Sequence, residues 1–158
     1  MRWFVLFMLL CSVACAGEEL LPFGSGSMKE ITQAHGNQPL VISFWSVDCA
    51  PCYDELRLWR EITGDYPQLH LVLVATDGSS SRQRVQQVLH ESGLTHLPNY
   101  QFIDGNNQRL RYQVDSHWYG ELPRTYLYTP GVEAPLAVSG VMERARLLAW
   151  LAAADIDM

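Results

Sequence analysis

Apolar residues are distributed along the chain in a pattern that predicts strands separated by helices. Nearly continuous apolar runs at residues 40–45 and 69–75 are typical of strands that are buried on both faces of a sheet. Shorter runs at 100–103, 124–128 and 135–139 predict further strands. A Pro-Gly turn separates the last two runs, so we expect them to pair antiparallel.

Helical spacing marks the segments between these runs. Ser27 and Glu30 fit a capping box that opens a short helix, and Gly36 is placed to end it. Apolar residues that recur on one face predict three longer helices, at 50–62, 81–92 and 141–154. Buried strands that alternate with helices indicate an α/β fold around a mixed sheet.

Residues 1–16 have the layout of a secretory signal peptide. Arg2 precedes a short apolar run, and a small-x-small cleavage site follows. An uncleaved anchor and a lipoprotein signal with an acylated Cys15 are the alternatives. In each case we expect the protein to work in a periplasmic or other extracytoplasmic compartment, where disulfides persist. Residues 17–27 are then interpreted as a tether and 28–158 as the folded domain.

Composition narrows the possible partners and isolates one pair of cysteines. The 158 residues are one domain's length, with a formal net charge of -6. The pI of about 5.2 and the lack of any Lys/Arg run argue against nucleic acid as a partner. A domain of this length needs no disulfide scaffold, so each cysteine requires its own explanation. Cys11 falls in the predicted signal peptide, which leaves Cys49 and Cys52 as the pair in the folded part.

Cys49 and Cys52 form a C-x-x-C motif where a predicted buried strand gives way to a helix. Unpaired backbone N–H groups and the helix dipole stabilise a thiolate at a helix start, and the thiolate is the attacking species in disulfide exchange. We therefore expect Cys49 to be the nucleophile and Cys52 the resolving thiol. Pro51 fixes the backbone in the first turn, where its missing N–H costs little.

The segment from Val41 to Leu56, VISFWSVDCAPCYDEL, resembles the active-site region of the TlpA-type thioredoxin-like oxidoreductases. The resemblance extends over about residues 28–154. It implies a thioredoxin-like fold, in which a central mixed β-sheet carries helices on both faces. It also implies an extracytoplasmic thiol-disulfide oxidoreductase that acts on protein thiols and disulfides without a bound cofactor.

The same resemblance suggests partners and a direction of electron flow. It favours a protein-disulfide reductant, as in cytochrome c maturation, that receives electrons from a membrane or other extracytoplasmic dithiol protein. The residues alone leave the direction open, because reducing and oxidising members of the superfamily differ in potential by about 150 mV.

The segment that begins at Leu122 matches the family's cis-proline region. The resemblance implies that Pro123 is cis and that Leu122 faces Cys49 and offers backbone hydrogen bonds to a bound partner. Trp45 is expected to be a core residue that also shields the disulfide. The neighbouring Trp118 and Tyr119 have two open interpretations, a docking surface or packing against the sheet.

Ser43 and three acidic residues near the motif bear on the chemistry of the cysteines. The buried acid of thioredoxin itself would fall at Ser43, so that base is expected to be absent. Asp48 places a carboxylate beside Cys49, where like-charge repulsion opposes thiolate formation while the helix dipole favours it. Two consequences are open, slower attack at neutral pH or selection of cationic partners. Glu55 matches a family position but is predicted to be surface charge. Asp77 follows a strand, and both a site role and turn capping are open.

Two other functions use the same cysteines. A copper-binding metallochaperone of thioredoxin fold would add His117 as a third ligand, although the five histidines are scattered along the chain. We expect no metal site, because zinc or iron would require a second cysteine pair or nearby histidines. Peroxide reduction is the least favoured of the three functions, since the sequence has no peroxidatic Thr-x-x-Cys arrangement.

Overall fold

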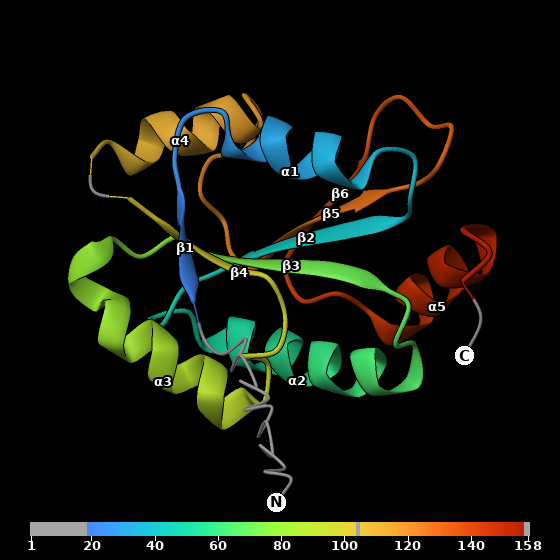
Figure 1. Ribbon diagram of the computed structural model, residues 1–158, viewed down its shortest axis with the longest axis horizontal. Helices are drawn as coiled ribbons and strands as arrows, with labels where there is room; N and C mark the ends of the chain where they lie inside the picture. The colour runs from blue at the N-terminus through green and yellow to red at the C-terminus, as the bar shows by residue number, and fades with distance from the viewer. Residues whose placement is uncertain (1–18, 104, 157–158) are drawn as a thin grey trace, which may run out of the picture.

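A six-stranded mixed sheet forms the centre of the molecule in a computed structural model that describes residues 19–103 and 105–156. The strands lie in the order β1-β4-β3-β2-β5-β6 (Figure 1). β1, β4, β3 and β2 run parallel, whereas β5 and β6 are antiparallel to their neighbours. The strands are β1 Leu20–Phe23, β2 Leu40–Trp45, β3 His70–Ala75, β4 Asn99–Phe102, β5 Arg124–Tyr128 and β6 Leu136–Ser139.

Helices cover both faces of this sheet. Figure 1 shows α1 and α4 on one face, and α2, α3 and α5 on the other. The helices are α1 Ser27–His35, α2 Ala50–Asp65, α3 Arg82–Ser92, α4 Asn107–Val114 and α5 Arg144–Ala153, with a single 3₁₀ turn at Ser79–Ser81. The predicted α/β architecture, a central mixed sheet flanked by helices on both faces, is confirmed.

The central strand β2 contributes side chains to two separate cores, which explains why every residue of its run except Ser43 is apolar. All of its residues are buried. Val41 and Trp45 pack with α2, α3 and α5, whereas Leu40, Ile42 and Phe44 pack with α1 and Trp118 on the other face. Because successive side chains of a strand point to opposite faces, only a strand covered on both sides requires apolar residues at every position.

The predicted helices are present, with differences at their ends. α2 continues through Gly64 to Asp65, three residues beyond its predicted end. The capping box at the start of α1 is wrong: Gly26 is the N-cap, and the Ser27 hydroxyl instead accepts a hydrogen bond from the backbone N–H of Gly24 at 2.9 Å. Gly36 ends α1, as predicted, with a positive φ of 57°.

The interpretation of residues 17–27 as a tether needs correction for β1. Leu20–Phe23 pairs in parallel with β4 along the edge of the sheet. Leu20 and Phe23 are buried, and the Phe23 ring stacks on Phe102 with centroids 5.3 Å apart. Pro22 concealed this strand in the sequence, but an edge strand tolerates proline because one of its sides makes no ladder bonds.

The predicted signal peptide, with Cys11 and Cys15, lies outside the described residues. Within residues 19–103 and 105–156, no helix is long and apolar enough to cross a membrane.

Candidate active site

Three chain segments that are distant in sequence meet at one end of the sheet. β2 and β3 are parallel, so the segments that follow them, at Ser46 and Thr76, lie at the same edge. β5 is antiparallel to β2 and pairs Phe44 with Arg124, which places the start of β5 at that edge as well. The C-x-x-C motif, the turn after β3 and the loop before β5 therefore surround one position.

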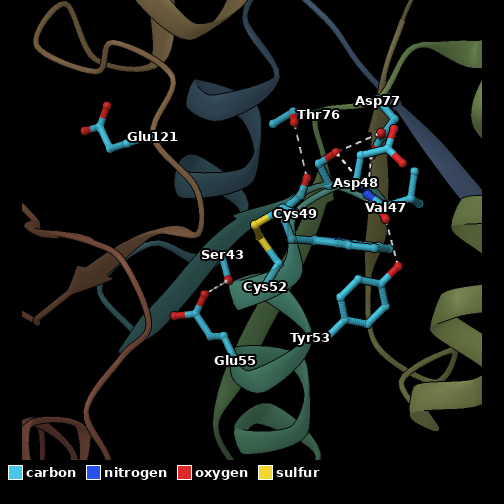
Figure 2. Close-up of a disulfide and its surroundings, with 12 residues drawn as sticks. Ser43, Val47, Asp48, Cys49, Cys52, Tyr53, Glu55, Thr76, Asp77 and Glu121 are labelled. Atoms are coloured by element: carbon cyan, nitrogen blue, oxygen red, sulfur yellow. Dashed lines mark hydrogen bonds between the residues drawn. A yellow bond between two sulfur atoms is a disulfide. The ribbon is translucent and has the colours of Figure 1, made fainter.

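Cys49 and Cys52 form a disulfide at the start of α2 (Figure 2), with their Cα atoms 5.3 Å apart. Cys49 is the N-cap residue of α2 and is partly exposed, whereas Cys52 is 0% exposed. Pro51 lies in the first helical turn, as predicted. Only Cys49 is accessible to a partner, and it sits at the positive end of the helix dipole.

The turn that carries Cys49 is held from β3 and from α2. Asp77 accepts hydrogen bonds from the Ser46 hydroxyl at 2.9 Å and from the Val47 backbone N–H at 3.1 Å (Figure 2). The Tyr53 hydroxyl donates to the Val47 carbonyl at 2.8 Å. Asp77 therefore reaches the site by capping this turn, so both interpretations offered for it apply.

Asp48 does not lie beside Cys49 as an isolated negative charge. Its carboxylate pairs with the Arg84 guanidinium of α3 at 2.8 Å, and both side chains are largely exposed. The opposing charge offsets the repulsion that a carboxylate would exert on a Cys49 thiolate.

Glu55 is the main correction to the sequence-based site. It was predicted to be surface charge, yet it is 1% exposed. Figure 2 shows it extending from the helical turn that follows Cys52. Its carboxylate accepts hydrogen bonds from the Thr125 hydroxyl at 3.1 Å, the Met142 backbone N–H at 3.3 Å and the Ser43 hydroxyl at 3.4 Å.

Burial raises the pKa of Glu55 from 4.5 to about 7, because desolvation outweighs the stabilising hydrogen bonds from Thr125, Met142 and Ser43. A group with this pKa can both accept and release a proton at neutral pH. The acid expected to be missing at Ser43 is therefore supplied from α2, and Ser43 is its hydrogen-bond partner.

A sequence signal for Glu55 was present in the helical spacing. Cys52, Leu56, Trp59 and Ile62 are all buried on the face of α2 that packs on the sheet. Glu55 follows Cys52 by three residues, and residues three apart lie on the same helix face. A carboxylate on that face must be buried, whatever its chemical type suggests.

The Leu122–Pro123 peptide bond is cis, as predicted. The partly buried Leu122 side chain packs against the core cluster that contains Cys52, and Cys49 packs against the same cluster. The Pro123 carbonyl accepts a hydrogen bond from Gly140 N–H at 2.9 Å. The N–H and C=O of Leu122 make no hydrogen bond within the part of the chain that the structure describes, so both are free for a partner strand.

Trp45 is a core residue, 1% exposed, in the same cluster as Cys52. Of the two interpretations of Trp118 and Tyr119, packing against the sheet applies to Trp118, and only Tyr119 is exposed as a docking surface requires. Trp118 is buried and donates its indole N–H to the Glu121 carbonyl at 2.9 Å, whereas Tyr119 is 89% exposed at the tip of the loop. Only Tyr119 is therefore available to a docking partner.

His117 has an exposed side chain that contacts Asp115, with Nδ1 and Oδ1 3.5 Å apart. Over residues 19–103 and 105–156, no group of three His, Cys, Asp or Glu side chains comes together to hold a metal ion. No geometric observation therefore favours the copper-binding alternative.

Comparison with known proteins places this site in context. No protein-family model matches the chain. The chain is 26% identical over 113 residues to the thiol-disulfide oxidoreductase ResA of Oceanobacillus iheyensis, an alignment that covers 71% of this chain and 55% of ResA. The chain thus spans about half the length of the curated relative that it matches.

Solved structures establish the fold. The chain superposes on MTB DsbF in its mixed oxidised and reduced forms with a TM-score of 0.61 and 16% identity, covering 77% of this chain and 84% of that one. It matches a secreted Mycobacterium tuberculosis disulfide oxidoreductase homologous to E. coli DsbE with a TM-score of 0.58 and 16% identity, covering 77% and 85% of the two chains. The fold is thioredoxin-like, as predicted.

Proposed function

We propose that this protein is a thiol-disulfide oxidoreductase of the ResA and DsbE type, working through the Cys49–Cys52 pair. One observation carries the proposal: the disulfide joins a partly exposed helix N-cap cysteine to a fully buried one, next to a buried carboxylate with a near-neutral pKa. A structural disulfide across so short a loop removes little unfolded-chain entropy and would have no need of this arrangement.

The exchange needs only the two thiols and a substrate disulfide. In the reduced protein, the Cys49 thiolate attacks one substrate sulfur, the substrate S–S bond breaks, and the other substrate sulfur leaves with the electron pair as a thiolate. The Cys52 thiolate then attacks the Cys49 sulfur of the mixed disulfide. The Cys49–Cys52 disulfide forms, the second substrate thiolate departs, and two electrons have passed from the protein to the substrate.

Glu55 supports the second step as a proton acceptor. Cys52 is fully buried, so its thiol requires an internal base before it attacks. The Glu55 carboxylate lies one helical turn further along α2, and its pKa of about 7 lets it hold a proton at the working pH and release it afterwards. The hydrogen bonds from Ser43, Thr125 and Met142 keep the carboxylate in place through both states.

Substrate docking is assigned to the loop before β5. The unpaired N–H and C=O of Leu122 match the hydrogen-bonding groups of an extended peptide that brings its cysteine to Cys49. Asp48, which pairs with Arg84, directly precedes Cys49 in the chain, and the exposed Tyr119 precedes Leu122 by three residues. No bound cofactor enters the cycle, because the dithiol itself stores the two electrons.

We also assign an extracytoplasmic location, within the TlpA type. The signal-peptide pattern of residues 1–16 supports it, and one structural relative, the Mycobacterium tuberculosis disulfide oxidoreductase, is secreted. The dithiol is then regenerated by a membrane or other extracytoplasmic dithiol protein. Reduction of disulfides during cytochrome c maturation fits this role, and acylation of Cys15 would hold the domain at the membrane.

Trapping of the mixed disulfide tests this function. We expect the reduced Cys52→Ala variant to accumulate a covalent adduct with a disulfide-containing peptide, because the resolving thiol is absent. The matched Cys49→Ala variant keeps only the buried thiol and should form none. Mass spectrometry that finds no adduct on Cys52→Ala, or equal adducts on both variants, would falsify the assignment of Cys49 as nucleophile.

A further inference from the structure

The side chain immediately after the cis-proline is a partly enclosed arginine at the centre of a polar cluster. Arg124 has 10% of its side chain exposed. Two carboxylates pair with its guanidinium: Nη2 donates to Asp115 Oδ2 at 2.7 Å, and Nη1 lies 3.3 Å from Glu121 Oε1. Two hydroxyls also accept from it: Nη1 donates to Ser139, and Nε donates to Tyr126 at 3.1 Å. We call Arg124, Asp115, Glu121, Tyr126 and Ser139 the Arg124 cluster.

The two carboxylates of the cluster organise the backbone of the loop. Asp115 Oδ1 accepts the His117 N–H at 2.8 Å, and Glu121 Oε2 accepts the Tyr119 N–H at 3.2 Å. Each carboxylate therefore uses one oxygen for the loop backbone and the other for Arg124. Desolvation raises the pKa of both carboxyl groups, but the lowering effects outweigh it. The His117 backbone N–H and then Arg124 lower the pKa of Asp115, and the backbone N–H of Glu121 itself, the Ser139 hydroxyl and Arg124 lower that of Glu121, so both lie below their ordinary values.

Two residues of the cluster flank the Leu122–Pro123 dipeptide in the chain. Glu121 precedes the dipeptide, Arg124 follows it, and their side chains are paired. Ser139 of β6 donates to Glu121 Oε1 at 2.8 Å, and the next residue, Gly140, donates its N–H to the Pro123 carbonyl. Figure 2 includes Glu121 among the surroundings of the disulfide. The loop is thus fixed to β5 and β6 at several points, although its tip is exposed.

We propose that Arg124 is a positioning residue for substrate binding: its cluster holds the loop from Asp115 to Pro123 in the conformation that presents the Leu122 backbone to a peptide partner. This inference rests on the proposed exchange function. Lysine could not replace Arg124, because only a planar guanidinium supplies donors in three directions at fixed angles. A preorganised loop avoids the entropic cost of ordering its backbone at each binding event.

A positioning role for Arg124 predicts different effects on two kinds of reaction partner, those that hydrogen-bond to the Leu122 backbone and those that do not. Dithiothreitol attacks the Cys49–Cys52 disulfide without forming strand-like hydrogen bonds, whereas a peptide disulfide requires them. We expect Arg124→Met to raise the KM for reduction of a synthetic disulfide peptide about 10-fold, with little change in kcat. The rate at which dithiothreitol reduces the oxidised protein should stay within about twofold of wild type. Arg124→Lys should not restore the peptide KM.

Two further variants make the experiment decisive. Arg144→Met removes an arginine that also pairs with two carboxylates, Glu61 and Asp65, away from the loop, and it should leave both rates unchanged. Glu121→Ala replaces a residue on the exposed rim of the cluster, and it should raise the peptide KM even if Arg124→Met fails to fold.

The outcomes distinguish this inference from the proposed function. An unchanged peptide KM in Arg124→Met, or in Glu121→Ala where the former does not fold, overturns the positioning role. Equal losses with peptide and dithiothreitol also overturn it, since the cluster would then act on the disulfide itself. If wild-type protein exchanges with neither reagent, the oxidoreductase function fails and the inference fails with it.

Discussion

At the scale of single residues, the chemistry of the site depends on which side chains are withdrawn from water. Cys49 and Cys52 are identical in type, yet only Cys49 is accessible, because the second lies on the buried face of α2. Glu55 follows on the same face and is held among hydroxyl and amide donors. Burial therefore distinguishes the nucleophile from the resolving thiol and turns an ordinary carboxylate into a near-neutral acid.

Glu55 should make the oxidised protein less stable as pH rises. Its pKa is raised from 4.5 to about 7 on folding, so between these values the folded state holds a proton that the unfolded state has released. The associated stability is fully present below pH 4.5 and is lost as pH rises through about 7. We expect the free energy of unfolding in urea to fall by about 3 kcal/mol between pH 5 and pH 8, through this group.

Glu55→Gln should remove this pH dependence, because glutamine does not titrate. Glu61→Gln is the matched control, since Glu61 is half-exposed on the same helix and pairs with Arg144, and it should keep the wild-type slope. If Glu55→Gln retains the full decline between pH 5 and pH 8, Glu55 is not the buried titrating group.

At the scale of elements, periodicity located most strands and helices but failed where polar or helix-breaking residues interrupt an apolar pattern. β2, β3, β5 and β6 were predicted within one or two residues of their observed ends. α4 is absent from the helices predicted by spacing, because none of its residues is fully buried. The sequence did not predict β1, because Pro22 and Gly24 are typical of a linker. Only two of the four side chains of β1 are buried in the core, so its apolar pattern is weak.

β1 should contribute to the stability of the domain, contrary to its interpretation as a tether. Phe23 is buried in contact with the rings of Phe44 and Phe102. We expect Phe23→Ala to lower the free energy of unfolding by about 3–5 kcal/mol, because it removes a buried ring and leaves a cavity.

Tyr112→Ala serves as the aromatic control, since Tyr112 is exposed on α4, and it should change stability by about 0.5 kcal/mol or less. Urea denaturation of the oxidised proteins compares the two directly. Equal, small effects of both substitutions would restore the tether interpretation.

At the scale of the whole molecule, the mixed sheet brings the active site together. The C-x-x-C turn, the Asp77 turn and the cis-proline loop come from three strands whose relevant ends share one edge. The motif and the cis-proline could be predicted because short sequence patterns specify them. The Ser43–Glu55–Thr125 contacts could not, because they join residues that are 12 to 82 positions apart. The Arg124 cluster could not either, because Asp115 and Ser139 are 9 and 15 positions from Arg124 and its charged members look like ordinary surface charge.

The reduction potential of the Cys49–Cys52 couple tests the central claim most directly. The oxidised protein would be equilibrated with glutathione or dithiothreitol buffers, and its free thiols would be alkylated and counted by mass spectrometry. We predict a single two-electron transition between about −120 and −270 mV, the range of thioredoxin-like catalysts, nearer the lower value if the protein is a reductant. A potential below about −300 mV, typical of a structural disulfide, would contradict the account.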